Sequence, residues 1–115
     1  MKTHRTVIAA AREAGVALLA YTSILHADTS PLGLAAEHLA TEALVHESGL
    51  THALLRNGWY TENYLASVPP ALQHGVFLGA AGEGRIASAS WADYAQAAAA
   101  VLVQATPSQQ VYELA

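Results

Sequence analysis

The 115-residue sequence contains no cysteine, so disulfide bonds, thiolate metal sites and a thiol nucleophile are excluded. Basic side chains are also few: five Lys and Arg residues stand against nine Asp and Glu residues, which gives a net charge of -4. They are scattered along the chain, and this argues against a nucleic-acid partner, since binding to phosphates needs concentrated positive charge. The chain also lacks a G-x-G-x-x-G fingerprint between a strand and a helix, the usual cradle for the phosphates of a dinucleotide.

Long apolar runs are missing as well. Lys2 and Arg5 followed by the apolar residues 7–11 imitate a secretion signal, but Arg12 ends this run after five residues. A signal peptide needs a longer run, and a membrane span needs about 20 apolar residues. With 53% hydrophobic residues the chain is too apolar to be disordered. We therefore predict one compact, soluble, cytoplasmic unit that has no membrane partner.

The order of apolar and polar segments predicts an α/β fold. Helices are expected at residues 3–14, 34–48, 63–72 (interrupted by Pro69 and Pro70) and 91–104. Strands are expected at residues 16–21, up to residue 56, and at 75–79, 85–88 and 111–114, the third and fourth joined by a glycine-rich turn. Continuous apolar strands are typical of a parallel sheet covered on both faces. Residues 1–115 are thus predicted to be the central part of a Rossmann-like domain, a partial doubly wound parallel sheet with flanking helices, and no second domain is expected.

The two ends of the sequence suggest that this sheet is incomplete. The chain opens on a helix without a preceding strand and stops just after a strand, whereas a doubly wound domain normally begins with the strand that leads into the phosphate loop. The missing strands would leave apolar sheet edges uncovered. We expect marginal stability, or self-association through the exposed edges.

A polar and aromatic turn follows the strand that ends near Arg56. It contains Asn57, Gly58, Trp59, Tyr60, Thr61 and Glu62. Polar groups that converge at the carboxyl edge of a parallel sheet mark ligand sites. Alternatively, Trp59, Tyr60 and Tyr64 only pack a loop onto the sheet.

Two other features carry weaker signals. The glycines of residues 79–84 lie between two expected strands, with no helix start after them to hold a pyrophosphate, so a hairpin turn explains them better. The six histidines fall on different elements and form no H-E-x-x-H pair: His4, His26, His38, His46, His52 and His74. We therefore predict no metal site.

Ser23 ends the first expected strand, where short-chain dehydrogenases hold a catalytic serine. Those enzymes carry a Tyr-x-x-x-Lys pair on the next helix, but here Leu34 and His38 occupy the two positions. A reductase without the proton-donating tyrosine suits an acceptor that takes hydride directly, as a quinone can. His38 could supply a proton, because the ordinary pKa of histidine is about 6.5. The alternative is a partly buried helix histidine without chemistry.

Several strings of the sequence resemble the NmrA-like atypical short-chain dehydrogenases, in particular their branch of NAD(P)H:quinone oxidoreductases of type 2. These strings are His4-Arg5 and residues 20–34, 55–64 and 111–115. The resemblance covers nearly the whole chain and is specific, since several long strings agree in order.

The resemblance implies an NADPH-dependent enzyme that reduces quinones by hydride transfer. In that family an N-terminal glycine loop and an arginine after the second strand hold the cofactor phosphates, and a small C-terminal domain holds the substrate. This chain contains none of these parts, so alone it is expected to be inactive. The turn maps onto the family's cofactor contacts near the nicotinamide end, which predicts NADPH contacts at Asn57, Gly58, Trp59, Tyr60, Thr61 and Glu62. An alternative is a dinucleotide-sensing regulator without catalysis, as some NmrA-like proteins are.

Overall fold

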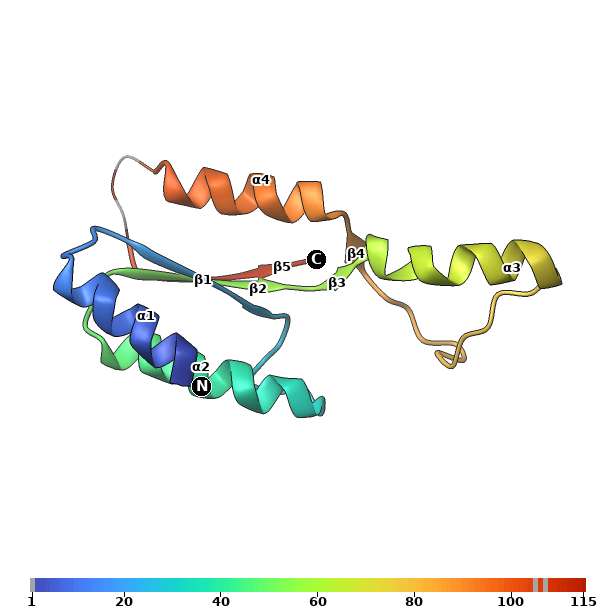
Figure 1. Cartoon of the computed structure of the whole chain (residues 1–115), viewed down its shortest axis with the longest axis horizontal. Helices are drawn as coiled ribbons and strands as arrows, with labels where there is room; N and C mark the ends of the chain where they lie inside the picture. The colour runs from blue at the N-terminus through green and yellow to red at the C-terminus, as the bar shows by residue number, and fades with distance from the viewer. Residues whose placement is uncertain (1, 105, 107) are drawn as a thin grey trace.

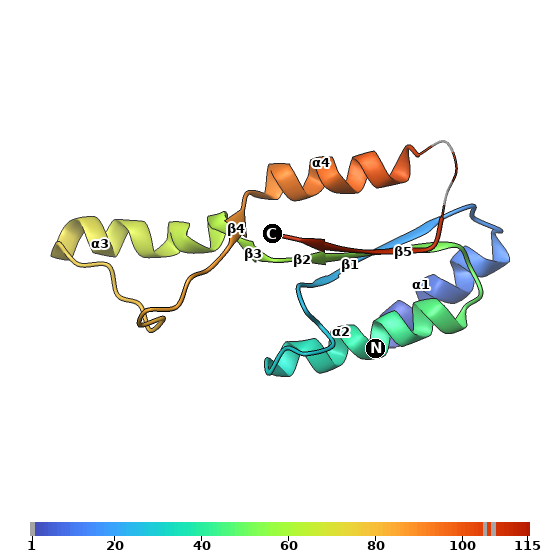
Figure 2. The ribbon, with the colours of Figure 1, turned by 180° about the vertical axis from the view of Figure 1, so that it is seen from behind.

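The computed structural model describes residues 2–104, 106 and 108–115. Its centre is a parallel three-stranded sheet in the order β1 (Leu19–Ile24), β2 (His52–Asn57) and β5 (Gln110–Leu114). Helices α1 (Lys2–Glu13) and α2 (Gly33–Glu47) lie on one face of this sheet, and α4 (Trp91–Leu102) lies on the other (Figure 1). The view from behind shows the same three layers (Figure 2). The predicted Rossmann-like parallel sheet with flanking helices is therefore confirmed.

Local sequence signals explain where the helices begin and end. Helix α4 begins after Ser90, whose hydroxyl accepts the N–H of Asp93 while the Asp93 carboxylate accepts the N–H of Ser90. This reciprocal capping box satisfies backbone donors that would otherwise be unpaired at the helix start. Helix α2 ends just before Gly49, which adopts a left-handed φ of 75° that glycine accepts without strain.

The core lies around β2, whose six residues are all buried. On the face of α4, Ala53 and Leu55 pack with Val101. On the opposite face, Val45 and Thr41 of α2 are almost completely buried. Burial on both faces is the property that the apolar strand pattern predicted.

An extension separates β2 from α4. It passes through β3 (Trp59–Tyr60), the 3-10 helix η1 (Thr61–Ser67), α3 (Val68–His74) and an open loop, and it returns at β4 (Ser88–Ala89), which pairs in parallel with β3. We call residues 61–87 the arm, because they project away from the sheet (Figures 1 and 2). The structure describes the whole arm, and none of its residues is buried.

The hairpin predicted in this region does not form, and elsewhere the first strand is displaced. The predicted strands at 75–79 and 85–88 do not form a hairpin; the described residues 75–87 contain no strand, and only Ser88 and Ala89 pair, with β3. The glycine-rich loop has no layer to pack on, so its short apolar run at residues 76–78 does not make a strand by itself. The predicted helix at 63–72 is divided near its prolines, as expected: η1 ends at Ser67, and Pro69 and Pro70 lie in the first turn of α3, which needs no backbone donor there. The first strand begins three residues later than Val16, at Leu19, and runs on to Ile24.

Within the described ranges, each helix is too short or too polar to span a bilayer.

Candidate functional site

A cavity of about 550 Å³ opens at the carboxyl edge of the sheet. Four segments line it: the end of β1 and the following residues (22–25), the region around the start of α2 (Leu32, Leu34 and His38), the β2–β3 turn (57–60), and the arm (Asn63 and 85–87). Its size falls within the range of small-molecule sites. The carboxyl edge is also where open α/β sheets bind their ligands.

The β2–β3 turn forms one wall of the cavity, and its geometry depends on Gly58. The Gly58 N–H donates to the Leu114 carbonyl at 2.7 Å, which ties the turn to β5. A Cβ atom on Gly58 would lie 3.0 Å from the Tyr94 hydroxyl and 3.1 Å from the Leu114 carbonyl oxygen. The position therefore needs a residue without a side chain.

Asn57 stands at the carboxyl end of β2, on the cavity. It is only 8% exposed, and its Nδ2 group contacts the Tyr60 hydroxyl at 3.4 Å. Its Oδ1 atom is buried and has no hydrogen-bond partner among the described residues. A buried, unpaired amide oxygen costs free energy unless a ligand or water satisfies it.

The aromatic residues of the turn divide between two roles. Tyr60 packs edge-to-face against Tyr94 and Trp91 of α4, with ring centroids 5.3 and 6.4 Å apart. Trp59 instead is 48% exposed and meets the Tyr64 ring at 6.5 Å. Both side chains line the cavity, so the turn packs onto the sheet and also faces a hollow.

The last two residues of the predicted cofactor segment hold other elements and lie outside the cavity lining. The Thr61 hydroxyl contacts the Ser88 hydroxyl at 3.2 Å, next to the short β3–β4 pair. Both carboxylate oxygens of Glu62 accept the Trp91 N–H, at 2.9 and 3.0 Å, which places negative charge at the start of α4. Contact of Thr61 and Glu62 with a cofactor remains a prediction.

His38 lies on α2 and lines the cavity opposite the turn. Its Nδ1 atom is hydrogen-bonded to the Tyr21 hydroxyl of β1 at 2.8 Å. Burial lowers the pKa of His38 below its ordinary value, and the negative charge of Glu42 opposes this effect in part. The contact with Tyr21 could not be read from the sequence, because the two residues come from different elements.

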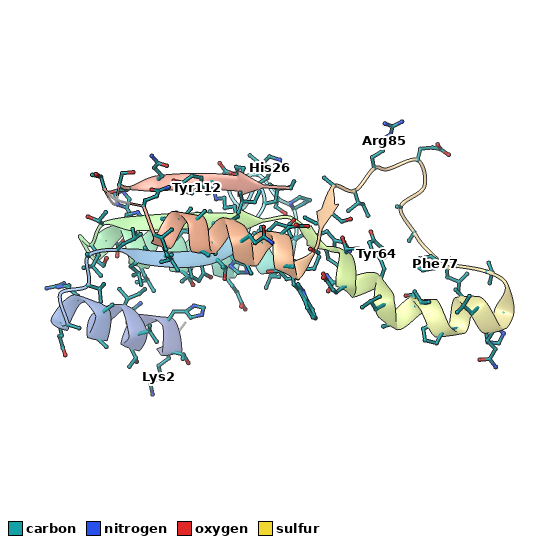
Figure 3. All side chains as sticks on the ribbon, turned by 90° about the horizontal axis from the view of Figure 1, so that it is seen from above. Lys2, His26, Tyr64, Phe77, Arg85 and Tyr112 are labelled. Atoms are coloured by element: carbon teal, nitrogen blue, oxygen red, sulfur yellow. The ribbon has the colours of Figure 1, made fainter. Side chains whose placement is uncertain are left out.

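A charge network lies behind the cavity and was not expected from the sequence. The Arg56 guanidinium binds both carboxylate oxygens of Glu42, with contacts of 3.0 and 2.8 Å, and Arg56 and Glu42 are both buried. It also contacts Glu113 at 2.8 Å and Asp28 at 3.2 Å. The His26 N–H donates to the second oxygen of Glu113 at 2.9 Å, and His26 stands beside β5 in Figure 3. Arg56 of β2 thus joins the loop between β1 and α2, helix α2 and strand β5.

The histidines do not gather into a metal centre. His46 and His52 approach each other, with ring centroids 5.7 Å apart. In the part of the chain that the structure describes, no three His, Asp or Glu side chains are placed to hold one ion.

The sheet, its helices and this edge cavity define a Rossmann-like α/β domain of the kind that binds a dinucleotide. No family model matches the sequence. Quinone oxidoreductase 2 of Escherichia coli is 65% identical over 112 residues, which cover 97% of this chain and 39% of that protein. The crystal structure of the E. coli NADPH-dependent quinone oxidoreductase in complex with NADPH superposes with a TM-score of 0.92 at 65% identity, over 97% of this chain and 40% of the other.

Two further relatives are more distant. A triphenylmethane reductase from Citrobacter, solved with NADP(H), has a TM-score of 0.89 at 34% identity, over 96% of this chain and 39% of the other. An NmrA-like family domain-containing oxidoreductase of Aspergillus flavus is 39% identical over 66 residues, 55% of this chain and 22% of that protein. The resemblance to the NmrA-like oxidoreductases and their quinone oxidoreductase branch is confirmed. The chain spans about 39% of the length of its E. coli relative.

Proposed function

We propose that this chain forms the nicotinamide end and the acceptor side of an NADPH-dependent quinone oxidoreductase. The observation that carries the proposal is the cavity at the carboxyl edge, which joins Asn57, Gly58, Trp59 and Tyr60 to His38 across one space. The reaction class comes from the E. coli relative, a quinone oxidoreductase whose structure was solved with NADPH.

The lining of the cavity fits the uncharged end of the cofactor better than its phosphates. The unpaired Oδ1 of Asn57 can accept a hydrogen bond from a carboxamide N–H, which the nicotinamide ring carries. Among the described lining residues Arg85 is the only Lys or Arg, too little positive charge for a pyrophosphate. Residues 57–62 would hold the nicotinamide end. When bound there, NADPH supplies a hydride.

Apolar side chains line the rest of the cavity, and such a surface suits a flat, weakly polar acceptor. They come from β1, the start of α2 and the arm: Ile24, Leu25, Leu32, Leu34 and Ile86. Two electrons and one proton arriving as hydride, together with one further proton, convert a quinone to a hydroquinone. His38 is the titratable side chain of the lining that could hydrogen-bond or protonate the acceptor.

A chimera tests this proposal. Residues 1–115 would replace the matching segment of the E. coli quinone oxidoreductase 2, and NADPH oxidation would be followed with a benzoquinone. We expect turnover by the chimera, and none by the 115-residue chain assayed alone. Asn57→Ala in the chimera is expected to raise the KM for NADPH roughly tenfold, as the loss of one well-placed hydrogen bond would.

The same assay separates catalysis from sensing. A folded chimera that binds NADPH but never turns over would contradict the proposal and favour a dinucleotide-sensing regulator. Glu47→Gln, at an exposed position at the end of α2 and outside the cavity lining, is the control for a general loss of structure.

Location in the cytoplasm and self-association remain predictions. Val111 of β5 is 54% exposed, and the structure places β1 and β5 at the two edges of the sheet. Sedimentation of the chain across a range of concentrations tests association through these edges. A monomer at every concentration, with a sharp and reversible melt, would contradict this expectation.

A further inference from the structure

A tyrosine that does not line the cavity contacts the histidine that does. Tyr21 lies on the α2 face of β1 and is half-buried, like His38. Its hydroxyl lies 2.8 Å from Nδ1 of His38, on the side of the imidazole that faces the sheet. The two rings are 5.9 Å apart and tilted by 44°, so the contact is made edge-on by the hydroxyl and not by stacked rings. Because this contact occupies Nδ1 and His38 lines the cavity, Nε2 is the ring nitrogen that remains available to a ligand.

The groups around this pair come from three elements. Glu37 and Glu42 of α2 and His4 of α1 are the charged or titratable groups that face His38, besides Tyr21 itself. The two carboxylates favour the imidazolium form, whereas burial and His4 oppose it, and the net effect is a lowered pKa. At neutral pH His38 is therefore mainly a neutral imidazole with a single N–H.

Donation from the Tyr21 hydroxyl to Nδ1 is the arrangement that suits a protonated phenol and a neutral imidazole, because an imidazole nitrogen is a much stronger acceptor than a phenol oxygen. Burial raises the pKa of Tyr21, while a hydrogen bond with Thr41 lowers it and the charge of Glu42 raises it further, so the hydroxyl stays protonated at neutral pH. The Thr41 hydroxyl donates to the Glu37 carbonyl at 3.0 Å. When the Tyr21 hydroxyl donates to Nδ1, the one proton of neutral His38 must sit on Nε2.

We propose that Tyr21 is a positioning residue, which holds His38 as the Nε2–H tautomer so that this N–H donates a hydrogen bond to a carbonyl oxygen of the acceptor in the cavity. The identity of that acceptor rests on the proposed function. A neutral imidazole polarises a carbonyl without giving up its proton, and it needs a fixed tautomer to do so. The reduced acceptor then takes its proton from solvent.

The pH dependence distinguishes this role from proton donation. The imidazolium form and the Nε2–H tautomer both carry an N–H at Nε2, so with His38 as a hydrogen-bond donor kcat/KM of the chimera for the quinone should stay level as the pH rises through the pKa of His38. A histidine acting as the acid would lose activity as it deprotonates over this range, and that result would overturn the proposal. His38→Gln keeps a side-chain N–H donor but does not titrate, so we expect this variant to keep part of the activity and the same level profile.

The decisive experiment reads the tautomer directly in the 115-residue chain by ¹⁵N–¹H NMR of the histidine rings, with His38→Gln used for assignment. In the wild-type chain we expect His38 to be protonated on Nε2, with Nδ1 as an acceptor. In Tyr21→Phe the Nδ1–H tautomer should increase roughly fivefold, as expected from the loss of one hydrogen bond. Tyr112→Phe is the matched control, because its hydroxyl contacts only Gln104 in the described chain, at 3.2 Å, and should leave His38 unchanged.

A wild-type spectrum with the proton on Nδ1 would overturn the proposal, even if Tyr21→Phe did not fold. An unchanged tautomer ratio in a folded Tyr21→Phe would overturn it as well. Neither outcome depends on NADPH oxidation. An inactive chimera whose His38 still shows the Nε2–H tautomer would instead refute the proposed function and leave the Tyr21–His38 geometry standing.

Discussion

The sheet and the arm are both rich in apolar residues, but only the sheet buries them. All six residues of β2 are buried, between α2 on one face and α4 on the other. In the arm, which is described throughout, none is buried, and Leu72 and Leu78 are 82% and 84% exposed. Apolar composition therefore does not create a core by itself. A second layer of structure must be present to cover each apolar face.

The cavity lies where these two regions meet. One wall belongs to the sheet, where the β2–β3 turn is tied to β5 and the Arg56 network lies just behind it. The other wall comes from the arm, whose Phe77 and Arg85 stand out from the rest of the molecule in Figure 3. The same substitution should therefore have very different effects on the two sides of the site, and the following predictions test this difference in order of decreasing effect.

Arg56→Met is expected to have the largest effect on stability. It would leave the Glu42 carboxylate buried without its bidentate partner, at a cost of about 4 kcal/mol of unfolding free energy. Urea denaturation measures this loss. Arg85→Met in the arm removes a guanidinium of the same size and should change the unfolding free energy by less than about 0.5 kcal/mol. Equal losses in the two variants would show that the Arg56 network does not stabilise the sheet.

Leu55→Ala should cause the next largest loss of unfolding free energy. Leu55 is 1% exposed in the core, so truncation removes buried methyl groups and leaves a cavity, at a cost of about 3 kcal/mol. Leu72→Ala makes the same chemical change on the exposed face of α3 and should be close to neutral. If Leu72→Ala also cost several kcal/mol, the arm would be covered in solution, and the contrast with the sheet would not hold.

Gly58→Ala tests the turn between the two regions. Because the new methyl group would lie 3.0 Å from the Tyr94 hydroxyl and 3.1 Å from a backbone oxygen, we expect a loss of about 2 kcal/mol. The cavity wall should shift with it, and the chimera should bind NADPH more weakly. Gly79→Ala, where nothing lies within 4 Å of the added Cβ, is the matched control. Full stability of Gly58→Ala would mean that the turn can move away from β5.

The fold was predictable to the extent that it depends on periodicity and caps. The three long helices and the last strand come out within a few residues of their predicted bounds, because an apolar face and a capping residue are local signals. The open loop at 75–87, where a hairpin was predicted, could not be foreseen in this way. A short apolar run specifies a strand only where a neighbouring strand or layer receives it, and the sequence does not show that the arm lacks one.

The site was predictable in its elements but not in its contacts. Asn57, Gly58, Trp59 and Tyr60 follow a buried strand, so their place at the carboxyl edge could be inferred from the sequence, and His38 was inferred from the position of a missing lysine. The contact between Tyr21 and His38 could not be inferred, because it depends on how α2 crosses β1. The same is true of Glu42, which stands fourteen positions before Arg56 in the sequence and pairs with it across two elements.

The smallest expected effect is on the pH dependence of the melting temperature, and it tests Glu42 alone. Burial alone would raise the pKa of Glu42, but the hydrogen bonds and charge of Arg56 outweigh it, so the folded-state pKa lies below 4.5. A carboxyl group with a lowered folded-state pKa stabilises the protein fully above the unfolded-state pKa and loses this contribution as the pH falls through the folded-state value. We therefore expect the melting temperature to fall below pH 4.5, more steeply in the wild-type chain than in Glu42→Gln.

Glu47→Gln provides the control for this slope, since Glu47 ends the same helix and is exposed. In Glu47→Gln the melting temperature should depend on pH as it does in the wild-type chain. Glu42→Gln should be less stable at neutral pH, and its melting temperature should change less as the pH falls. Because Glu113 and Asp28 also contact Arg56, part of the slope should remain in Glu42→Gln and disappear only when Glu113 is changed to Gln as well. Parallel curves for all of these variants would mean that the acid sensitivity arises outside the Arg56 network, and that the sheet side of the cavity is held by packing alone.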